Sequence, residues 1–86
     1  MKREAEEDWG RERWLNEREH LAQADRHIAE CKDHIASHHK FIREIEQRGQ
    51  DASWAKEMLQ AFEETLGVFE KHRQLIIDRL KDTQRQ

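Results

Sequence analysis

The fold is decided by residues 21–51, which read LAQADRHIAECKDHIASHHKFIREIEQRGQD. Up to residue 45, apolar or small side chains and one histidine alternate in steps of three and four: Leu21, Ala24, Ile28, Cys31, Ile35, His38, Ile42 and Ile45. This spacing is typical of the apolar seam of a coiled-coil helix. It predicts a first helix over about residues 9–48. The seam weakens toward the N-terminus, so we expect residues 1–8 to fray or to continue as a solvated helix.

The end of this stretch predicts a turn at residues 49–51. Gly49 readily takes the left-handed conformation that ends a helix, and Asp51 can accept the first free amides of the next one. The same spacing then returns in Ala52, Ala55, Leu59, Phe62, Leu66, Phe69, Arg73, Ile76 and Leu80, and predicts a second helix over about residues 52–82. The chain is therefore expected to be all-α, a single domain over residues 1–86 that forms an antiparallel two-helix coiled-coil hairpin.

Folding the chain at this turn pairs residues whose numbers sum to about 100. The expected pairs include Cys31 with Phe69, His27 with His72, and Ile28 with Arg73. The guanidinium of Arg73 should then reach Glu70 or Glu30, while its alkyl stem packs in the seam.

The apolar face of the second helix is wider than one partner helix can cover, since it spans roughly 160°. The residues beside the seams that we expect to mediate self-association are Trp54, Met58, Ala61, Thr65, Val68 and Leu75 on the second helix, and His34 and Phe41 on the first. Two hairpins could close these faces as a four-helix bundle in a homodimer. The alternative is a monomeric hairpin that leaves this flank in water.

The histidines are the side chains that most suggest a metal site or a pH-responsive site. His34 and His38 have the i, i+4 spacing that can bring two imidazoles to one ion, and His27 and His72 are expected to meet across the hairpin. Two ligands do not make a site, so these four are weak metal candidates, and we expect no metal and no cofactor. Protonation of histidines at a dimer interface would weaken association, although a histidine is also tolerated as an ordinary flanking residue.

Two tryptophans lie where the first helix outruns the second. Trp9 and Trp14 have few or no expected partners within the hairpin, so they are candidate contacts for a second subunit or for a different protein. They could equally cap the end of the bundle.

Composition narrows the class of function. Sixteen basic and nineteen acidic residues are interleaved, for a net charge of −3, which disfavours nucleic-acid binding. Signal-peptide and membrane-spanning patterns are not found, and one cysteine cannot form an internal disulfide, so we expect a cytoplasmic protein without membrane contact. Phosphate loops, CxxC and HExxH motifs are also missing, and we expect no enzymatic activity.

Three segments resemble a known group of proteins: His20 to Glu30, the turn Gly49-Gln50-Asp51, and Leu59 to Leu66 followed by His72-Arg73. They are similar to short uncharacterised helical-hairpin proteins of alpha-proteobacteria. The resemblance implies a natural bacterial cytoplasmic protein, and it supplies no catalytic or binding residue. We therefore expect a non-enzymatic structural or protein-interaction module; the alternative is a small-ligand, metal or pH-responsive sensor that uses the histidines.

Overall fold

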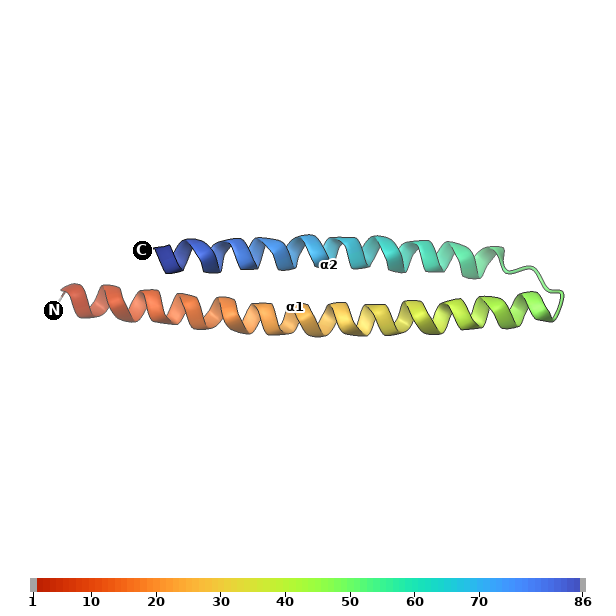
Figure 1. Cartoon of the computed structure of the whole chain (residues 1–86), viewed down its shortest axis with the longest axis horizontal. Helices are drawn as coiled ribbons and strands as arrows, with labels where there is room; N and C mark the ends of the chain where they lie inside the picture. The colour runs from red at the N-terminus through yellow and green to blue at the C-terminus, as the bar shows by residue number, and fades with distance from the viewer. Residues whose placement is uncertain (1, 86) are drawn as a thin grey trace.

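The chain folds as a hairpin of two long helices. A computed structural model describes the backbone of residues 2–85 and the side chains of residues 11–82. Helix α1 spans Lys2–Gln47 and helix α2 spans Ser53–Arg85. They run antiparallel along their whole shared length (Figure 1), in a molecule of 72 × 15 × 14 Å. The predicted all-α, two-helix hairpin is thereby confirmed.

Helix α1 is longer than the predicted helix and overhangs α2 at the N-terminal end (Figure 1). It has 46 residues against 33 in α2. At a rise of 1.5 Å per residue, the difference corresponds to about 20 Å. Alanine, glutamate, lysine and arginine dominate its first turns, and these residues sustain a helix without tertiary contacts better than most. The N-terminal residues therefore continue the helix from Lys2.

The turn at residues 48–52 begins with a Schellman motif. The amide of Gly49 donates to the carbonyl of Glu46 at 2.9 Å, and the amide of Gln50 donates to the carbonyl of Ile45 at 3.1 Å. These two bonds satisfy carbonyls that the end of a helix leaves free. Gly49 has a φ of +73°, a conformation in which a side chain would be strained. The predicted helix stop at this glycine is confirmed.

Asp51 caps α2, as its position after the glycine predicts. Its Oδ1 accepts hydrogen bonds from the amide of Ser53 at 3.0 Å and from the Ser53 hydroxyl at 2.6 Å. These bonds from Ser53 lower the pKa of Asp51 below its usual value of 3.8, and the charge of Lys56 adds to the effect. The cap lets α2 start directly after a turn of five residues.

The core is a single narrow seam between the two helices. Among residues 11–82, eight are buried, and all of them occupy predicted seam positions: Ala24, Ile28, Cys31, Ile42, Ile45, Ala52, Ala55 and Ile76. Near the turn, Ile42, Ile45, Ala52 and Ala55 form one cluster, against which Leu59 packs. Ile76 is the only large side chain among the described residues that is fully buried. One hairpin thus buries little apolar surface for its length.

The register between the helices differs from the predicted one by about three residues. Cys31 Sγ contacts the carbonyl of Phe62 at 3.5 Å, and His27 packs on Phe69, three residues before its predicted partner His72. The shift arises at the turn, because Ala52 folds back into the cluster around Ile45 directly after the Asp51 cap. The ring contacts His27–Phe69 and His34–Phe62 both join residues whose numbers sum to 96.

Membrane insertion as a spanning helix finds no support in the part of the chain that the structure describes. Neither of its helices has a stretch long and apolar enough to cross a bilayer.

Candidate self-association surface

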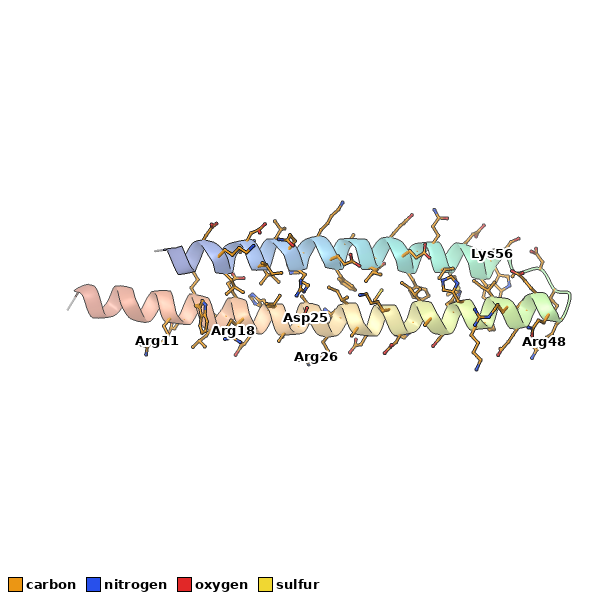
Figure 2. The ribbon with its side chains drawn as sticks, viewed as in Figure 1. Arg11, Arg18, Asp25, Arg26, Arg48 and Lys56 are labelled. Carbon is orange, nitrogen blue, oxygen red and sulfur yellow. The ribbon has the colours of Figure 1, made fainter. Side chains whose placement is uncertain are left out.

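The two edges of the hairpin differ in chemistry, and one of them carries two ion pairs between the helices. On this polar edge, Lys56 forms an ion pair with Glu46 at 3.2 Å, and Arg73 pairs with Asp25. Arg73 therefore contacts Asp25 and not Glu70 or Glu30, the partners expected from the sequence, because the register is shifted. Elsewhere, arginines such as Arg11 and Arg26 project from α1 away from α2 (Figure 2).

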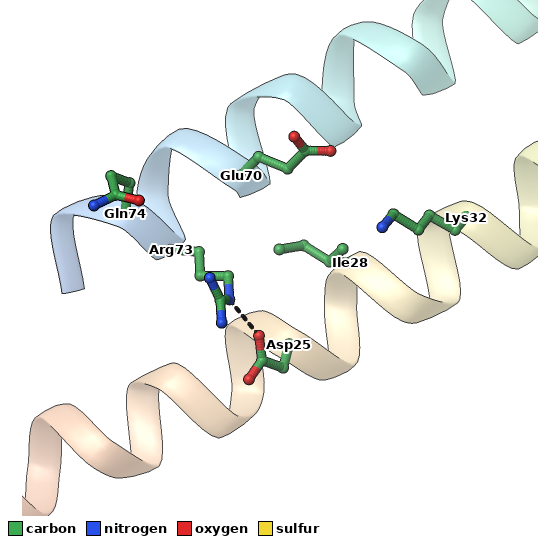
Figure 3. A pocket seen from close by; sticks show the side chains of 6 residues that line it. All are labelled: Asp25, Ile28, Lys32, Glu70, Arg73 and Gln74. Carbon is green, nitrogen blue, oxygen red and sulfur yellow. Dashed lines mark hydrogen bonds and ion pairs between the residues drawn. The ribbon is translucent and has the colours of Figure 1, made fainter. Parts of the chain in front are cut away.

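A groove of about 440 Å³ opens on the polar edge. Figure 3 shows its lining, with Arg73 reaching across to Asp25 and with Lys32, Glu70, Gln74 and Ile28 around them. Cations and carboxylates alternate here and partly neutralise one another, so the groove offers neither a cluster of one sign nor an enclosed apolar pocket. We assign no ligand to it.

The opposite edge, which we call the aromatic edge, carries pairs of rings that pack against each other between the helices. His27 lies 5.6 Å from Phe69, His34 lies 6.1 Å from Phe62, and Phe41 lies 5.6 Å from Trp54, measured between ring centroids. The three α1 residues are seven positions apart, which sets their rings in one column along the helix. Such aromatic contacts stabilise the pairing of the helices beyond simple area burial.

All eight residues that the sequence predicts for self-association are exposed in the single hairpin. The exposed fractions of the large ones are 65% for Val68, 55% for Leu75, 52% for Trp54, 45% for Met58 and 40% for Phe41. Ala61, Thr65 and His34 are exposed as well. A row of exposed large apolar side chains on one face of a small protein commonly marks an interaction surface.

Along α2 these exposed residues make a regular pattern of their own. Residues 54, 58, 61, 65, 68, 72 and 75 alternate in steps of four and three, parallel to the seam that packs on α1. We call this set the outer seam of α2. A helix with two adjacent seams can contact two neighbouring helices at once, which is the arrangement of a bundle.

The four histidines proposed as weak metal candidates do not converge. His38 is half-buried and donates from Nε2 to the carbonyl of Ala55 at 2.7 Å, while the rings of His27 and His34 rest on phenylalanines. His72 lies on the outer seam of α2. Among the residues that the structure describes, no group of three or more His, Cys, Asp or Glu side chains could hold a metal ion.

The N-terminal part of α1 holds the two tryptophans proposed as partner contacts, but α2 extends to Arg85, so Trp14 lies opposite its last turns and not beyond its end. Trp14 is half-buried, and the guanidinium of Arg18 lies 4.9 Å from its ring centroid. The side chain of Trp9 lies outside the described residues. Leu15, which sequence reasoning missed because it falls off the seam, is 49% exposed beside Trp14. The end of α1 thus adds an apolar side chain to the candidate contact region.

Comparison with known proteins adds no further assignment: no family model, curated protein or solved structure matches the chain. The resemblance to alpha-proteobacterial hairpin proteins stays a prediction from the sequence.

Proposed function

We propose that the chain is a non-enzymatic structural module that associates with a second copy of itself to form a four-helix bundle. The observation that carries this proposal is the outer seam of α2. Its apolar residues repeat with coiled-coil spacing, and they lie in water in the single hairpin. A seam of this kind is stable only when another helix covers it.

Surface area supports the same proposal. The hairpin exposes 7354 Å², whereas a compact monomer of its 10.5 kDa would expose about 5,400 Å². The excess is about 2,000 Å² per chain, whereas an interface of standard size buries only about 800 Å² on each partner. Covering the excess on two chains would take about 4,000 Å² in total, which lies in the range of obligate homodimer interfaces.

Sedimentation equilibrium over a concentration series tests the proposal directly. We expect a dimer that persists to low micromolar concentration. A variant with Val68→Glu and Leu75→Glu should sediment as a monomer, because four carboxylates per dimer would enter the interface. The matched control carries Ala29→Glu and Ala36→Glu, two exposed positions of α1 outside the aromatic edge. The control should remain dimeric, and circular dichroism should show both variants to be helical.

A monomeric wild type at tens of micromolar would contradict self-association. It would leave the aromatic edge as a surface for a different protein, since its apolar residues would then stay exposed.

The N-terminal part of α1 is the second part of the proposal. Trp14 and Leu15 offer an apolar contact opposite the last turns of α2, and Trp9 adds to it in sequence. Sedimentation of Trp14→Ala distinguishes its two possible partners. A weaker dimer would assign Trp14 to the subunit interface, and an unchanged dimer would favour contact with another protein.

A further inference from the structure

One histidine lies within the outer seam of α2, among apolar side chains. His72 is exposed in the single hairpin, with Val68 one turn before it and Leu75 one turn after it on the same face. In the part of the chain that the structure describes, no carboxylate forms an ion pair or a hydrogen bond with its ring. A second helix that covers the outer seam therefore covers an imidazole that has no acidic partner within the hairpin.

We infer that His72 makes the homodimer pH-dependent, so that two copies associate while this ring is neutral and separate when it is protonated. The inference rests on the proposed homodimer and adds its regulation. A neutral imidazole costs little to cover beside valine and leucine, whereas an imidazolium cation costs much more unless a carboxylate pairs with it. A symmetric dimer covers two copies of His72, so the effect of protonation is doubled.

The titratable groups that α1 presents to this part of the seam do not remove that cost. The ring of His27 rests on Phe69, three residues before His72, so a second imidazole on the same edge becomes a cation over the same range of pH. The acidic side chain of α1 on this flank is Glu30, which lies three residues after His27 and four before His34. It can neutralise one of those two rings when they are protonated, but not both.

The charged groups of α2 near the outer seam are engaged elsewhere or lie at its rim. Arg79, seven residues after His72, contacts Glu17, which also contacts His20. The column of α2 beside the seam contains Glu57, Glu64, Lys71 and Asp78. In a symmetric dimer this mixed column flanks the seam of both copies at the rim, where charges are hydrated and interact weakly. The outer seam itself contains no carboxylate in either copy, so a proton on His72 leaves an unpaired charge in the interface.

Sedimentation equilibrium of the unmodified chain at pH 8.0 and at pH 5.5 tests the inference. Imidazoles change charge within this interval, whereas carboxylates ordinarily titrate below it. Asp51, whose pKa is lowered below 3.8, stays ionised throughout. Separated copies bind more protons than the dimer, so association weakens as the pH falls. We expect the dimer to be weaker at pH 5.5 by about tenfold or more, because each of its two covered rings contributes up to about tenfold for every pH unit below the midpoint of a free imidazole.

Two substitutions of His72 and one control identify the titrating group. His72→Gln keeps a polar side chain of similar size that takes up no proton, and His72→Leu continues the apolar seam. Dimers of both variants should have the same affinity at the two pH values to within about threefold. The control is His39→Gln, an exposed histidine in the column of Asp25 and Glu46 on the polar edge. Its dimer should weaken in acid as much as that of the wild type.

The outcomes separate this inference from the homodimer on which it rests. A wild-type dimer of equal affinity at both pH values would overturn the switch and leave the homodimer standing. The switch also fails if both His72 variants weaken in acid as much as the wild type, because the titrating group would then lie elsewhere. Loss of helix by circular dichroism at pH 5.5 in the wild type and in both variants alike would assign the effect to unfolding and overturn the switch. A chain that is monomeric at tens of micromolar at pH 8.0 would overturn the homodimer itself.

Discussion

His38 of α1 and Ala55 of α2 are joined by a hydrogen bond of 2.7 Å from the imidazole Nε2 to the carbonyl oxygen. A carbonyl oxygen can only accept a hydrogen bond, so Nε2 carries a proton and is the donor. The second ring nitrogen, Nδ1, takes no part in this bond. The ring also packs edge-on against Phe62 and lies 5.8 Å from Phe41. These contacts of His38 join the hairpin seam to the aromatic edge.

Two substitutions of His38 should distinguish the contribution of its packing to stability from the contribution of its hydrogen bond. We expect His38→Ala to lower the free energy of unfolding by about 2 kcal/mol, because it removes both. His38→Leu keeps the volume and should cost less than about 1 kcal/mol. Urea unfolding at one fixed protein concentration measures both values. Equal losses in the two variants would assign the whole effect to the hydrogen bond.

Zinc, nickel and copper should leave the thermal unfolding midpoint unchanged. The Nε2 of His38 is engaged by Ala55, the ring of His34 stacks on Phe62, and no third ligand joins them among the described residues. A metal bound specifically to the folded chain, at a hundredfold excess over its dissociation constant, would add about 2.7 kcal/mol of stability. A midpoint shift of that size, lost in His34→Ala, would revive the sensor alternative.

The cap formed by Asp51 should make the stability of the hairpin depend on acid pH. Hydrogen bonds from Ser53 lower the pKa of Asp51 in the folded chain below 3.8. The stabilising contribution is therefore present above the unfolded value and is lost as the pH falls through the folded value. We expect wild type to lose more thermal stability between pH 7 and pH 2.5 than Asp51→Ala does.

Asp51→Asn is the matched control for this pH effect. Its side-chain oxygen can accept the same bonds, so its stability at pH 7 should stay near that of wild type. It cannot titrate, so the contribution of the cap should not fall with pH. An identical loss in acid for all three proteins would show that the cap contributes nothing through Asp51.

Sequence patterns alone were sufficient to predict both helices, the stop at Gly49 and the cap at Asp51, because each depends on local chemistry. The three-residue shift in register was not predictable in this way. It depends on how Ala52 packs after the cap, and therefore on tertiary contacts near Ile45. The pairing of Arg73 with Asp25 was missed for the same reason, since it follows from the shift.

Some features of the candidate self-association surface were predictable from the sequence, and others were not. The exposed strip on α2 was predictable, because heptad spacing tells which side chains the first partner helix cannot cover. The contact of His27 with Phe69 and the stacking of His34 on Phe62 were not, since they depend on the register. The contrast between a polar edge and an aromatic edge therefore emerged only from the three-dimensional arrangement.

Glu17 occupies a seam position where an apolar residue would fit better. Its side chain is only 15% exposed, and its Oε2 is buried without a hydrogen-bond partner. Its contacts with two basic side chains are long, with His20 Nδ1 at 3.9 Å from Oε2 and Arg79 Nη1 at 3.8 Å from Oε1. Replacement of an incompletely satisfied carboxylate by an apolar side chain of similar volume is commonly neutral or stabilising.

We therefore expect Glu17→Leu to raise the free energy of unfolding by about 1 to 2 kcal/mol, because it extends the hairpin seam toward Trp14. Urea unfolding at fixed protein concentration measures the change. Glu19→Leu, at an exposed position two residues on, is the control and should change stability by less than about 0.5 kcal/mol. A loss of stability in Glu17→Leu would mean that the carboxylate holds Arg79 more strongly than its distance suggests, and that the end of the hairpin depends on this charge pair.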